Sequence, residues 1–177
     1  MRVALFFGSF NPLHIGHIAI CKYLLDSGEI DQLRLIVSPQ NPLKDNAVVD
    51  NSTDRLEHVR CSASNLGKEV VVSDIEFSMT PPLYTLNTLR KLSSLEPNNE
   101  FILIIGADNL AIIEQWKLWE NLFKEYQVWV YPRSGYNGEE LCKRYGARLI
   151  DAPNIDVSST QIREGEADGK DLSYLKA

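Results

Sequence analysis

The fold is decided by residues 3–17, VALFFGSFNPLHIGH. The first five of these residues are all apolar, which is typical of a parallel strand that is covered on both faces. Gly8 follows this strand, and a glycine there lets the backbone turn sharply and approach a ligand closely. A helix is expected to begin near Ile15. The stretch therefore predicts a strand, a tight loop and a helix start.

The same alternation of strand and helix patterns continues along the chain. Strands are predicted at residues 3–7, 33–38, 70–73, 101–105, 127–131 and 148–150. Helices are predicted at residues 15–27, 54–65, 85–92, 108–123 and 139–145. Repeated strand–helix units imply right-handed crossovers and an open parallel α/β sheet with helices on both faces. No stretch resembles a linker, so we expect a single domain over residues 1–177, with ligands bound beyond the carboxyl ends of the strands.

Composition limits the partners of such a domain. The chain carries 18 Lys and Arg residues against 24 Asp and Glu residues, which gives a formal net charge of −6. This acidic balance argues against a surface that grips long nucleic acid, but it leaves room for a small phosphorylated ligand. Three widely spaced cysteines, Cys21, Cys61 and Cys142, predict free, buried thiols in a reducing cytoplasm. The apolar runs are too short for a membrane helix, so a membrane is not an expected partner either.

Two histidines, His14 and His17, stand three residues apart at the predicted helix start and share one face of its first turn. A lone histidine is usually a surface or core group, and a pair with this spacing is also found as half of a metal site. A metal site would need a cysteine or carboxylate nearby, and this loop has none, so no metal ligand is predicted. With Gly8 and Gly16 beside them, at a helix start that attracts anions, the histidines favour phosphate binding.

A second helix start is predicted around Ser158. Ser158 and Gln161 have the spacing of a capping box, which is a purely structural reason for this pattern. The same start also presents the hydroxyls of Ser159 and Thr160 and the guanidinium of Arg163, a group that can grip a phosphate through two hydrogen bonds. From the residues alone, the structural and the phosphate-binding interpretations are equally supported.

Lys44 lies in a proline-punctuated loop after the second predicted strand. A lysine in such a loop is usually just solvated. At the carboxyl end of a strand, beside two helix starts that suit phosphate, it is a candidate phosphate ligand.

Residues 8–17, GSFNPLHIGH, resemble the signature (G)(S/T)F(D/N)PxHxGH of the nucleotidylyltransferase superfamily, and SSTQIR resembles the SSTxIR motif of the same superfamily. The resemblance implies the Rossmann-like nucleotidylyltransferase fold, in which the first strand, loop and helix bind ATP. It implies that His17 stabilises the α-phosphate in the transition state and that His14 contacts the phosphates beside it. It also implies a phosphate contact from Arg163 and ATP contacts from Gly8, Ser9, Phe10, Gly16, Ser159 and Thr160. Residues 41–44, NPLK, resemble the NPPHK or NPFK segment of the superfamily, which implies a phosphate contact from Lys44.

Three central patches resemble one branch of that superfamily, the bacterial nicotinate-nucleotide adenylyltransferases. They are YTLNTL at residues 84–89, IIGADNL at residues 104–110 followed by Trp116, and RSGY at residues 133–136. The resemblance implies that Trp116 stacks on a pyridine ring, while backbone near Thr85 and Trp116 recognises its carboxylate. It implies that Asp108 meets the nucleotide sugars as part of the ATP site. The residues that it assigns to the mononucleotide are Tyr84, Thr85, Trp116 and Arg133.

The resemblance implies a reaction of NAD biosynthesis, in which ATP and nicotinate mononucleotide give deamido-NAD and pyrophosphate. Mg²⁺ would be carried by ATP. The attacking phosphate is already an anion at neutral pH, so the reaction requires no general base. The alternatives are a phosphopantetheine adenylyltransferase, a cytidylyltransferase and a non-catalytic nucleotide-binding module. The sequence leaves open the choice between the nicotinate and nicotinamide mononucleotides, and whether the chain forms a homo-oligomer.

Overall fold

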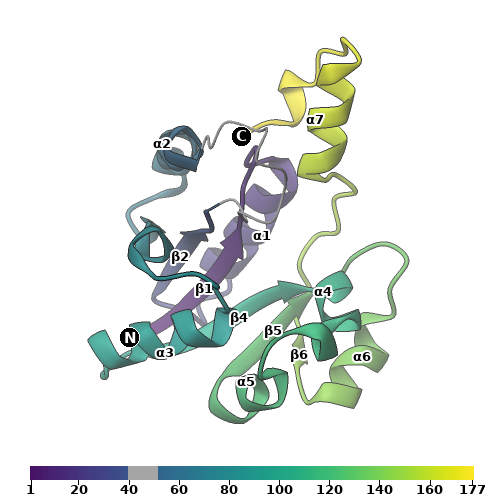
Figure 1. Ribbon diagram of the computed structural model, residues 1–177. Helices are drawn as coiled ribbons and strands as arrows, with labels where there is room; N and C mark the ends of the chain where they lie inside the picture. Colours follow the sequence, from purple (N-terminus) through teal and green to yellow (C-terminus); the bar gives the residue numbers. More distant parts are fainter. Residues whose placement is uncertain (40–51) are drawn as a thin grey trace.

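The computed structural model describes residues 1–39 and 52–177, and within these residues its centre is an open six-stranded sheet (Figure 1). Neighbouring strands are all parallel, in the order β3-β2-β1-β4-β5-β6. The strands are β1 (Arg2–Gly8), β2 (Gln32–Val37), β3 (Val70–Ser73), β4 (Glu100–Gly106), β5 (Gln127–Tyr131) and β6 (Arg148–Leu149). The predicted α/β fold with an open parallel sheet is thereby confirmed.

The strand order reverses between β1 and β4. From β1 the chain moves outward through β2 to β3, and from β4 it moves the other way through β5 to β6. Phe6 of β1 lies opposite Ile104 of β4, so the carboxyl ends of the two strands are side by side. This is the crevice in which open parallel sheets bind ligands. The loops after Gly8 and Gly106 both lead out of it.

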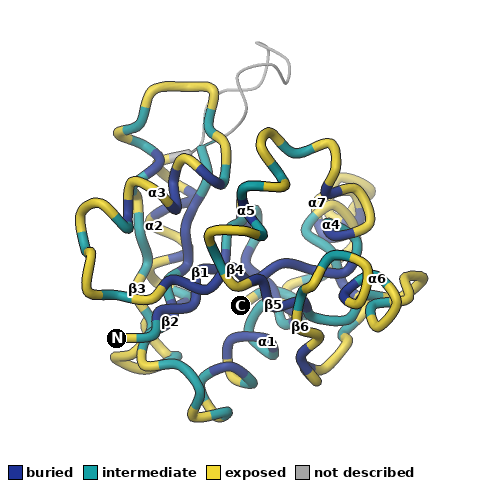
Figure 2. Tube along the Cα trace, turned by 90° about the horizontal axis from the view of Figure 1, so that it is seen from below, coloured by how far each residue is buried: buried dark blue, intermediate teal, exposed yellow. Residues whose placement is uncertain are grey.

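Helices cover both faces of the sheet because successive residues of a strand point to opposite faces. Ala4 and Phe6 pack in one apolar cluster with α1 (Ile15–Asp26) and α2 (Ser52–Ala63), whereas Val3 and Leu5 pack in another with the helices between Thr85 and Tyr145. Figure 2 shows the central strands as buried tube between the two helical layers. The α-helices are α1 (Ile15–Asp26), α2 (Ser52–Ala63), α3 (Thr85–Leu95), α4 (Ala107–Ala111), α5 (Trp119–Glu125), α6 (Gly138–Tyr145) and α7 (Ser159–Ala167). The 3₁₀ helices are η1 (Ser64–Leu66), η2 (Ile75–Ser78), η3 (Ile113–Gln115) and η4 (Ser173–Leu175).

The chain shows no candidate for a bilayer-spanning helix in the part that the structure describes. The three cysteines are free, with Cys21 and Cys142 buried and Cys61 exposed. The prediction of free thiols is confirmed, whereas the prediction that they are buried is wrong for Cys61.

The prediction of one helix over residues 108–123 is wrong, because the chain forms α4, η3 and α5 in turn. Leu118, the residue before α5, is left-handed with φ 58° and ψ 35°, a conformation that an α-helix cannot contain. Leu110, Ile113 and Leu122 are nevertheless all buried in one apolar cluster. Ile113 and Leu122 are nine residues apart, which would place them about 180° from each other around a continuous helix. One unbroken helix could not bury both in the same cluster, so this spacing is the sequence signal of the break. The remaining predicted elements differ from the structure by a few residues at their ends.

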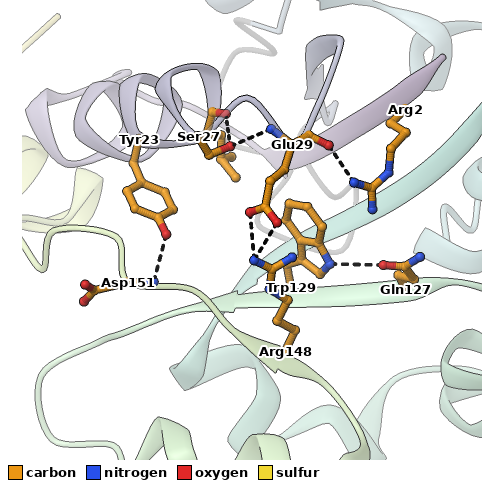
Figure 3. Close-up of polar contacts among 9 residues, drawn as sticks. Arg2, Tyr23, Ser27, Glu29, Gln127, Trp129, Arg148 and Asp151 are labelled. Carbon is orange, nitrogen blue, oxygen red and sulfur yellow. Dashed lines mark hydrogen bonds and ion pairs between the residues drawn. The ribbon is translucent and has the colours of Figure 1, made fainter.

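Polar contacts connect the strands at the end of the sheet that lies opposite the loops after Gly8 and Gly106 (Figure 3). The guanidinium carbons of Arg148 and Arg2 lie 4.5 Å and 5.5 Å from the ring centroid of Trp129. Arg148 also donates to both carboxylate oxygens of Glu29, at 2.9 Å and 2.7 Å, and these bonds lower the pKa of Glu29. Arg2 donates to the Glu29 carbonyl at 2.7 Å. The cluster ties β1, β5 and β6 to the end of α1 and leaves the opposite edge free for a ligand.

Candidate active site

A pocket of about 150 Å³ lies where the loops after β1, β4 and β5 meet the segment before α7. Its position is the ligand crevice that the strand order predicts. Among its lining residues are six that the sequence singled out, namely His14, Gly16, His17, Asp108, Arg133 and Ser159. Sequence segments that are far apart are therefore gathered in one hollow.

His14 and His17 cap the backbone of α1 for each other. His14 is the N-cap residue, and its Nδ1 accepts from the backbone N–H groups of Gly16 at 3.1 Å and of His17 at 3.4 Å. In return, His17 Nδ1 accepts from the backbone N–H of His14 at 3.1 Å. The two rings stack with their centroids 3.6 Å apart. The arrangement is a capping box in which histidines replace the usual Ser or Thr and Glu or Gln.

This cap determines where each histidine carries its proton. A ring nitrogen that accepts a hydrogen bond has no proton of its own, so each neutral ring carries its hydrogen on Nε2. Burial, with the charge of Arg133 as a smaller cause, lowers the pKa of His14 to about 4. Burial lowers the pKa of His17 well below its ordinary value, with smaller contributions from His14 and Arg133. At neutral pH the site therefore offers two uncharged Nε2–H donors.

Phe10 lies behind the histidines. It is a left-handed residue with φ 48° and is 2% exposed. Its ring packs edge-on against Phe6 and His17, with centroids 5.6 Å and 5.1 Å away. The Phe10 side chain thus supports the ring of His17 from the core.

The glycines of this loop leave space for those rings. A Cβ atom at Gly16 would lie 2.9 Å from Cε1 of His14, and one at Gly8 would lie 3.0 Å from the ring of Phe10. Both distances are shorter than ordinary van der Waals contact. The His14 ring, as well as any ligand, therefore requires a residue without a Cβ atom at position 16.

The segment before α7 forms the predicted cap: Ser158 Oγ accepts from the Gln161 N–H at 3.1 Å, and Gln161 Oε1 accepts from the Ser158 N–H at 2.9 Å. This cap fixes the backbone at the start of α7, where Ser158 and Ser159 line the pocket.

Side chains from α7 also bind the first loop directly. Ser159 Oγ donates to the carbonyl of Pro12 at 2.8 Å. Arg163 donates to the carbonyl of Asn11 at 2.5 Å and to Thr160 Oγ1 at 3.2 Å. Arg163 lines an adjoining groove of about 300 Å³ rather than the pocket itself. The two predicted phosphate-binding segments are therefore bonded to each other.

Asp108 and Arg133 face each other across the pocket. Arg133 Nε lies 4.0 Å from Asp108 Oδ1, which is shielded from solvent and has no hydrogen-bond partner among the described residues. Tyr131, at the end of β5, lines the wall between them. Burial, helped by the charge of Asp108, raises the pKa of Tyr131 to about 12, so its hydroxyl stays neutral.

Further lining residues that were not predicted from the sequence are Tyr131, Pro153, Asn154, Ile155 and Val157. Tyr131 is the last residue of a predicted strand and the other four follow one, so the available signal was their position at the carboxyl ends of strands.

The other predicted residues lie elsewhere. Tyr84 and Thr85 begin α3, and Tyr84 is 36% exposed. Trp116 follows η3 and packs against the apolar cluster of the α3 to α6 face. None of these three lines the pocket. Lys44 lies outside the described residues.

The fold and the pocket define a nucleotide-binding α/β protein, with a capped helix start at the switch point of a parallel sheet. The cytidylyltransferase-like family model matches residues 5–165. A relative from Cytophaga hutchinsonii, named as a probable nicotinate-nucleotide adenylyltransferase, is 39% identical and aligns over 99% of this chain and 91% of its own. A relative of the same name from Porphyromonas gingivalis is 42% identical over 98% of this chain and 88% of its own. The chain therefore belongs to the cytidylyltransferase-like family, among the nicotinate-nucleotide adenylyltransferases.

A solved structure has the same fold. Plasmodium falciparum nicotinic acid mononucleotide adenylyltransferase, complexed with NaAD, matches with a TM-score of 0.74 at 19% identity. The match covers 92% of this chain and 82% of that chain. The nucleotidylyltransferase fold implied by the first loop is thereby confirmed.

Proposed function

We infer that this chain is a nucleotidyltransferase that moves the adenylyl group of ATP to nicotinate mononucleotide, giving deamido-NAD and pyrophosphate. The observation that carries this conclusion is the match, over almost the whole chain, to relatives that bear the name of that activity. The pocket at the switch point supplies the matching chemistry, because its capped helix start and neutral histidines suit a polyphosphate.

The reaction needs positioning and charge stabilisation more than proton transfer. The attacking mononucleotide phosphate has a second pKa near 6, so most of it is already a dianion at neutral pH. Direct attack on the α-phosphorus then displaces pyrophosphate. Groups that hold the two phosphates in line and stabilise the charge that develops on their oxygens are sufficient for catalysis.

We assign the transition-state donors to His14 and His17. Their Nε2–H groups are available because both Nδ1 atoms are used by the cap. In this role His17 donates to an oxygen of the α-phosphate and His14 to the phosphates beside it. Because both rings stay neutral, they stabilise the transition state by hydrogen bonding without giving up a proton.

We assign the β- and γ-phosphates to Ser159, Thr160 and Arg163, together with Lys44. The support is the bonding of α7 to the first loop, which puts Arg163 beside Asn11. On binding ATP, the Arg163 guanidinium would exchange the Asn11 carbonyl for phosphate oxygens, which it can grip through two hydrogen bonds. The backbone of residues 8–10 and Gly16 would frame the nucleotide, and Asp108 would meet its sugar.

Nucleotidyltransferases use a divalent metal with ATP, and we propose that the ion is Mg²⁺. The described residues contain no group of three or more His, Cys, Asp or Glu side chains that could hold an ion. The described lining of the pocket has a single carboxylate, Asp108. Magnesium typically binds one or two carboxylates together with substrate phosphates, so this set fits an ion that arrives on ATP.

We assign the mononucleotide to Tyr84, Thr85, Trp116 and Arg133, with the pyridine ring stacked on Trp116. Arg133 belongs to the described pocket, and the exposed Tyr84 marks the start of α3. A volume of about 150 Å³ is below the ~300–1,000 Å³ of typical ligand sites, which supports a second substrate region outside the pocket. Since ATP is the other substrate, a cytoplasmic location is also proposed.

A pyrophosphate-release assay with ATP and a panel of acceptors tests the function. The panel contains nicotinate mononucleotide, nicotinamide mononucleotide and phosphopantetheine. We expect release with nicotinate mononucleotide, and the ratio to the amide measures the preference between the two pyridines. Release with phosphopantetheine alone, or with no acceptor in the panel, would contradict the proposal.

A further inference from the structure

Glu76 is a buried carboxylate to which the proposed reaction gives no role. The residue is 4% exposed and lies in η2, between β3 and α3. Its Oε1 accepts from Ser38 Oγ at 2.9 Å, and its Oε2 accepts from Thr88 Oγ1 at 3.1 Å. Burying a carboxylate costs free energy unless hydrogen bonds satisfy it. An apolar side chain could fill the same space without this cost, so the two hydrogen bonds of Glu76 need an explanation other than packing.

On one side, Ser38 is bonded to the phosphate-binding loop. Ser38 directly follows β2, and its backbone N–H donates to the carbonyl of Gly8 at 2.9 Å. Arg55 of α2 is 5% exposed, and its Nη1 donates to the carbonyls of Ser38 at 3.1 Å and of Ser9 at 2.6 Å. Ser38 is thus held against Gly8 and Ser9 by its backbone while its hydroxyl binds Glu76.

On the other side, Thr88 is bonded to the start of α3. Thr88 is fully buried, and its backbone N–H donates to the carbonyl of Tyr84 at 3.2 Å. The Thr88 hydroxyl is 3.4 Å from the same carbonyl and 3.1 Å from Glu76, so its single hydrogen is better placed for the carboxylate. Hydrogen bonds therefore run without interruption from Ser9 to Tyr84.

We propose that Ser38, Glu76 and Thr88, with Arg55, form a positioning relay that sets the distance between the ATP loop and the helix that receives the mononucleotide. This inference rests on the proposed function, because it takes Ser9 and Tyr84 to belong to the two substrate regions. The relay residues touch neither substrate and act through the backbone on which the substrates sit.

A relay of this kind suits a reaction between two bound phosphates. The reacting atoms must come within about 3–3.5 Å of each other, and a displacement of about 1 Å can cost on the order of 10²-fold in rate. The first loop follows β1, whereas Tyr84 lies outside the pocket, between η2 and α3. A carboxylate can accept from both hydroxyls at once, so Glu76 joins these two paths directly.

Replacing Thr88 with valine removes the hydroxyl and keeps the shape of the side chain. We expect kcat with both substrates to fall about 10-fold, because the reacting atoms are no longer held at the required distance. The KM for ATP should stay within about 3-fold. Thr88→Ser, which keeps the hydroxyl, should recover kcat to within about 3-fold of the unmodified protein. Ser93→Ala is the matched control: it removes a 2.8 Å bond to Tyr126 at the far end of the same helix and should leave kcat unchanged.

Amide hydrogen exchange without substrates provides a second readout. Thr88→Val should raise exchange in residues 8–17 of the first loop, and Ser93→Ala should not. Ser38→Ala breaks the relay from the other end, so it should give the same two effects and carries the test if Thr88→Val does not fold. Combining the two changes should lower kcat no further than the larger single change, because both interrupt one path.

Each result has a defined consequence. An unaltered kcat or unaltered loop exchange in these variants overturns the relay, as do losses of kcat that multiply in the double variant. A protein without substitutions that makes no dinucleotide overturns the proposed function instead, and hydrogen exchange then still decides whether the relay couples the two segments.

Discussion

Replacing His17 separates two tasks that one side chain performs. Its Nδ1 accepts from the His14 backbone at 3.1 Å, and its ring packs 5.1 Å from the ring of Phe10. Alanine removes one partly buried hydrogen bond, worth about 1 kcal/mol, and three ring contacts, with Phe6, Phe10 and His14, worth about 0.5 kcal/mol each. We therefore expect the free energy of unfolding to fall by roughly 1–3 kcal/mol, which leaves the fold intact. Loss of a transition-state donor should lower kcat by about 10²-fold or more.

Two further substitutions at this position distinguish the cap from the donor. His17→Asn puts an oxygen close to the place of Nδ1 but does not reach as far as Nε2, so stability should return while kcat stays near that of the alanine variant. His17→Gln extends a neutral N–H group to about the reach of Nε2, and glutamine is also a usual residue at this position of a capping box. Its kcat should lie within about 10-fold of that of the unmodified protein.

Urea unfolding followed by circular dichroism measures the stability of each variant, and pyrophosphate release measures kcat. The reasoning would be refuted by a folded His17→Gln variant that is as slow as His17→Ala. That result would show that the imidazole must transfer a proton, which a glutamine amide cannot do.

The pH dependence of stability, a glycine and a tryptophan give three more predictions. The pKa of His14 is about 4 in the folded protein against an ordinary value of 6.5. As the pH falls below 6.5 the unfolded chain therefore binds protons first, and the free energy of unfolding should decrease until about pH 4. Urea titrations should show a smaller decrease for His14→Asn, and an identical decrease would contradict the lowered pKa of His14. Gly16→Ala puts a Cβ 2.9 Å from the His14 ring and should lower kcat at least about 10-fold in the pyrophosphate assay, whereas full activity would show that the ring position is not critical. Trp116→Ala should raise the KM for the mononucleotide far more than the KM for ATP, and equal increases would mean that Trp116 is only structural.

The sheet could be predicted because its signals are local. Each strand is a short apolar run, and the first loop combines Gly8 with a helix start within ten residues of sequence. The break at Leu118 was missed because the apolar residues on both sides of it were assigned to one helix. Ile113 and Leu122 are nine residues apart, about 2.5 turns of an α-helix, so the burial of both in one cluster requires a break between them.

The sequence predicts His14 and His17 as phosphate ligands, and the structure places both in the pocket. Their mutual capping could not be predicted, because it depends on ring orientations that only the folded loop defines. Tyr131, Pro153, Asn154, Ile155 and Val157 line the pocket because the pairing of β4, β5 and β6 brings their segments together. Ser38, Glu76 and Thr88 are scattered in sequence, so nothing short of the fold could reveal their contacts.

The proposed reaction moves the α-phosphoryl group of ATP, with its adenosine, directly onto nicotinate mononucleotide. ATP labelled at the α-phosphorus tests this most directly, with the products separated after a single turnover. All transferred label should appear in deamido-NAD, with one pyrophosphate released for each dinucleotide and no label on the protein. Label retained on the protein, or absent from the dinucleotide while pyrophosphate is released, would contradict the account.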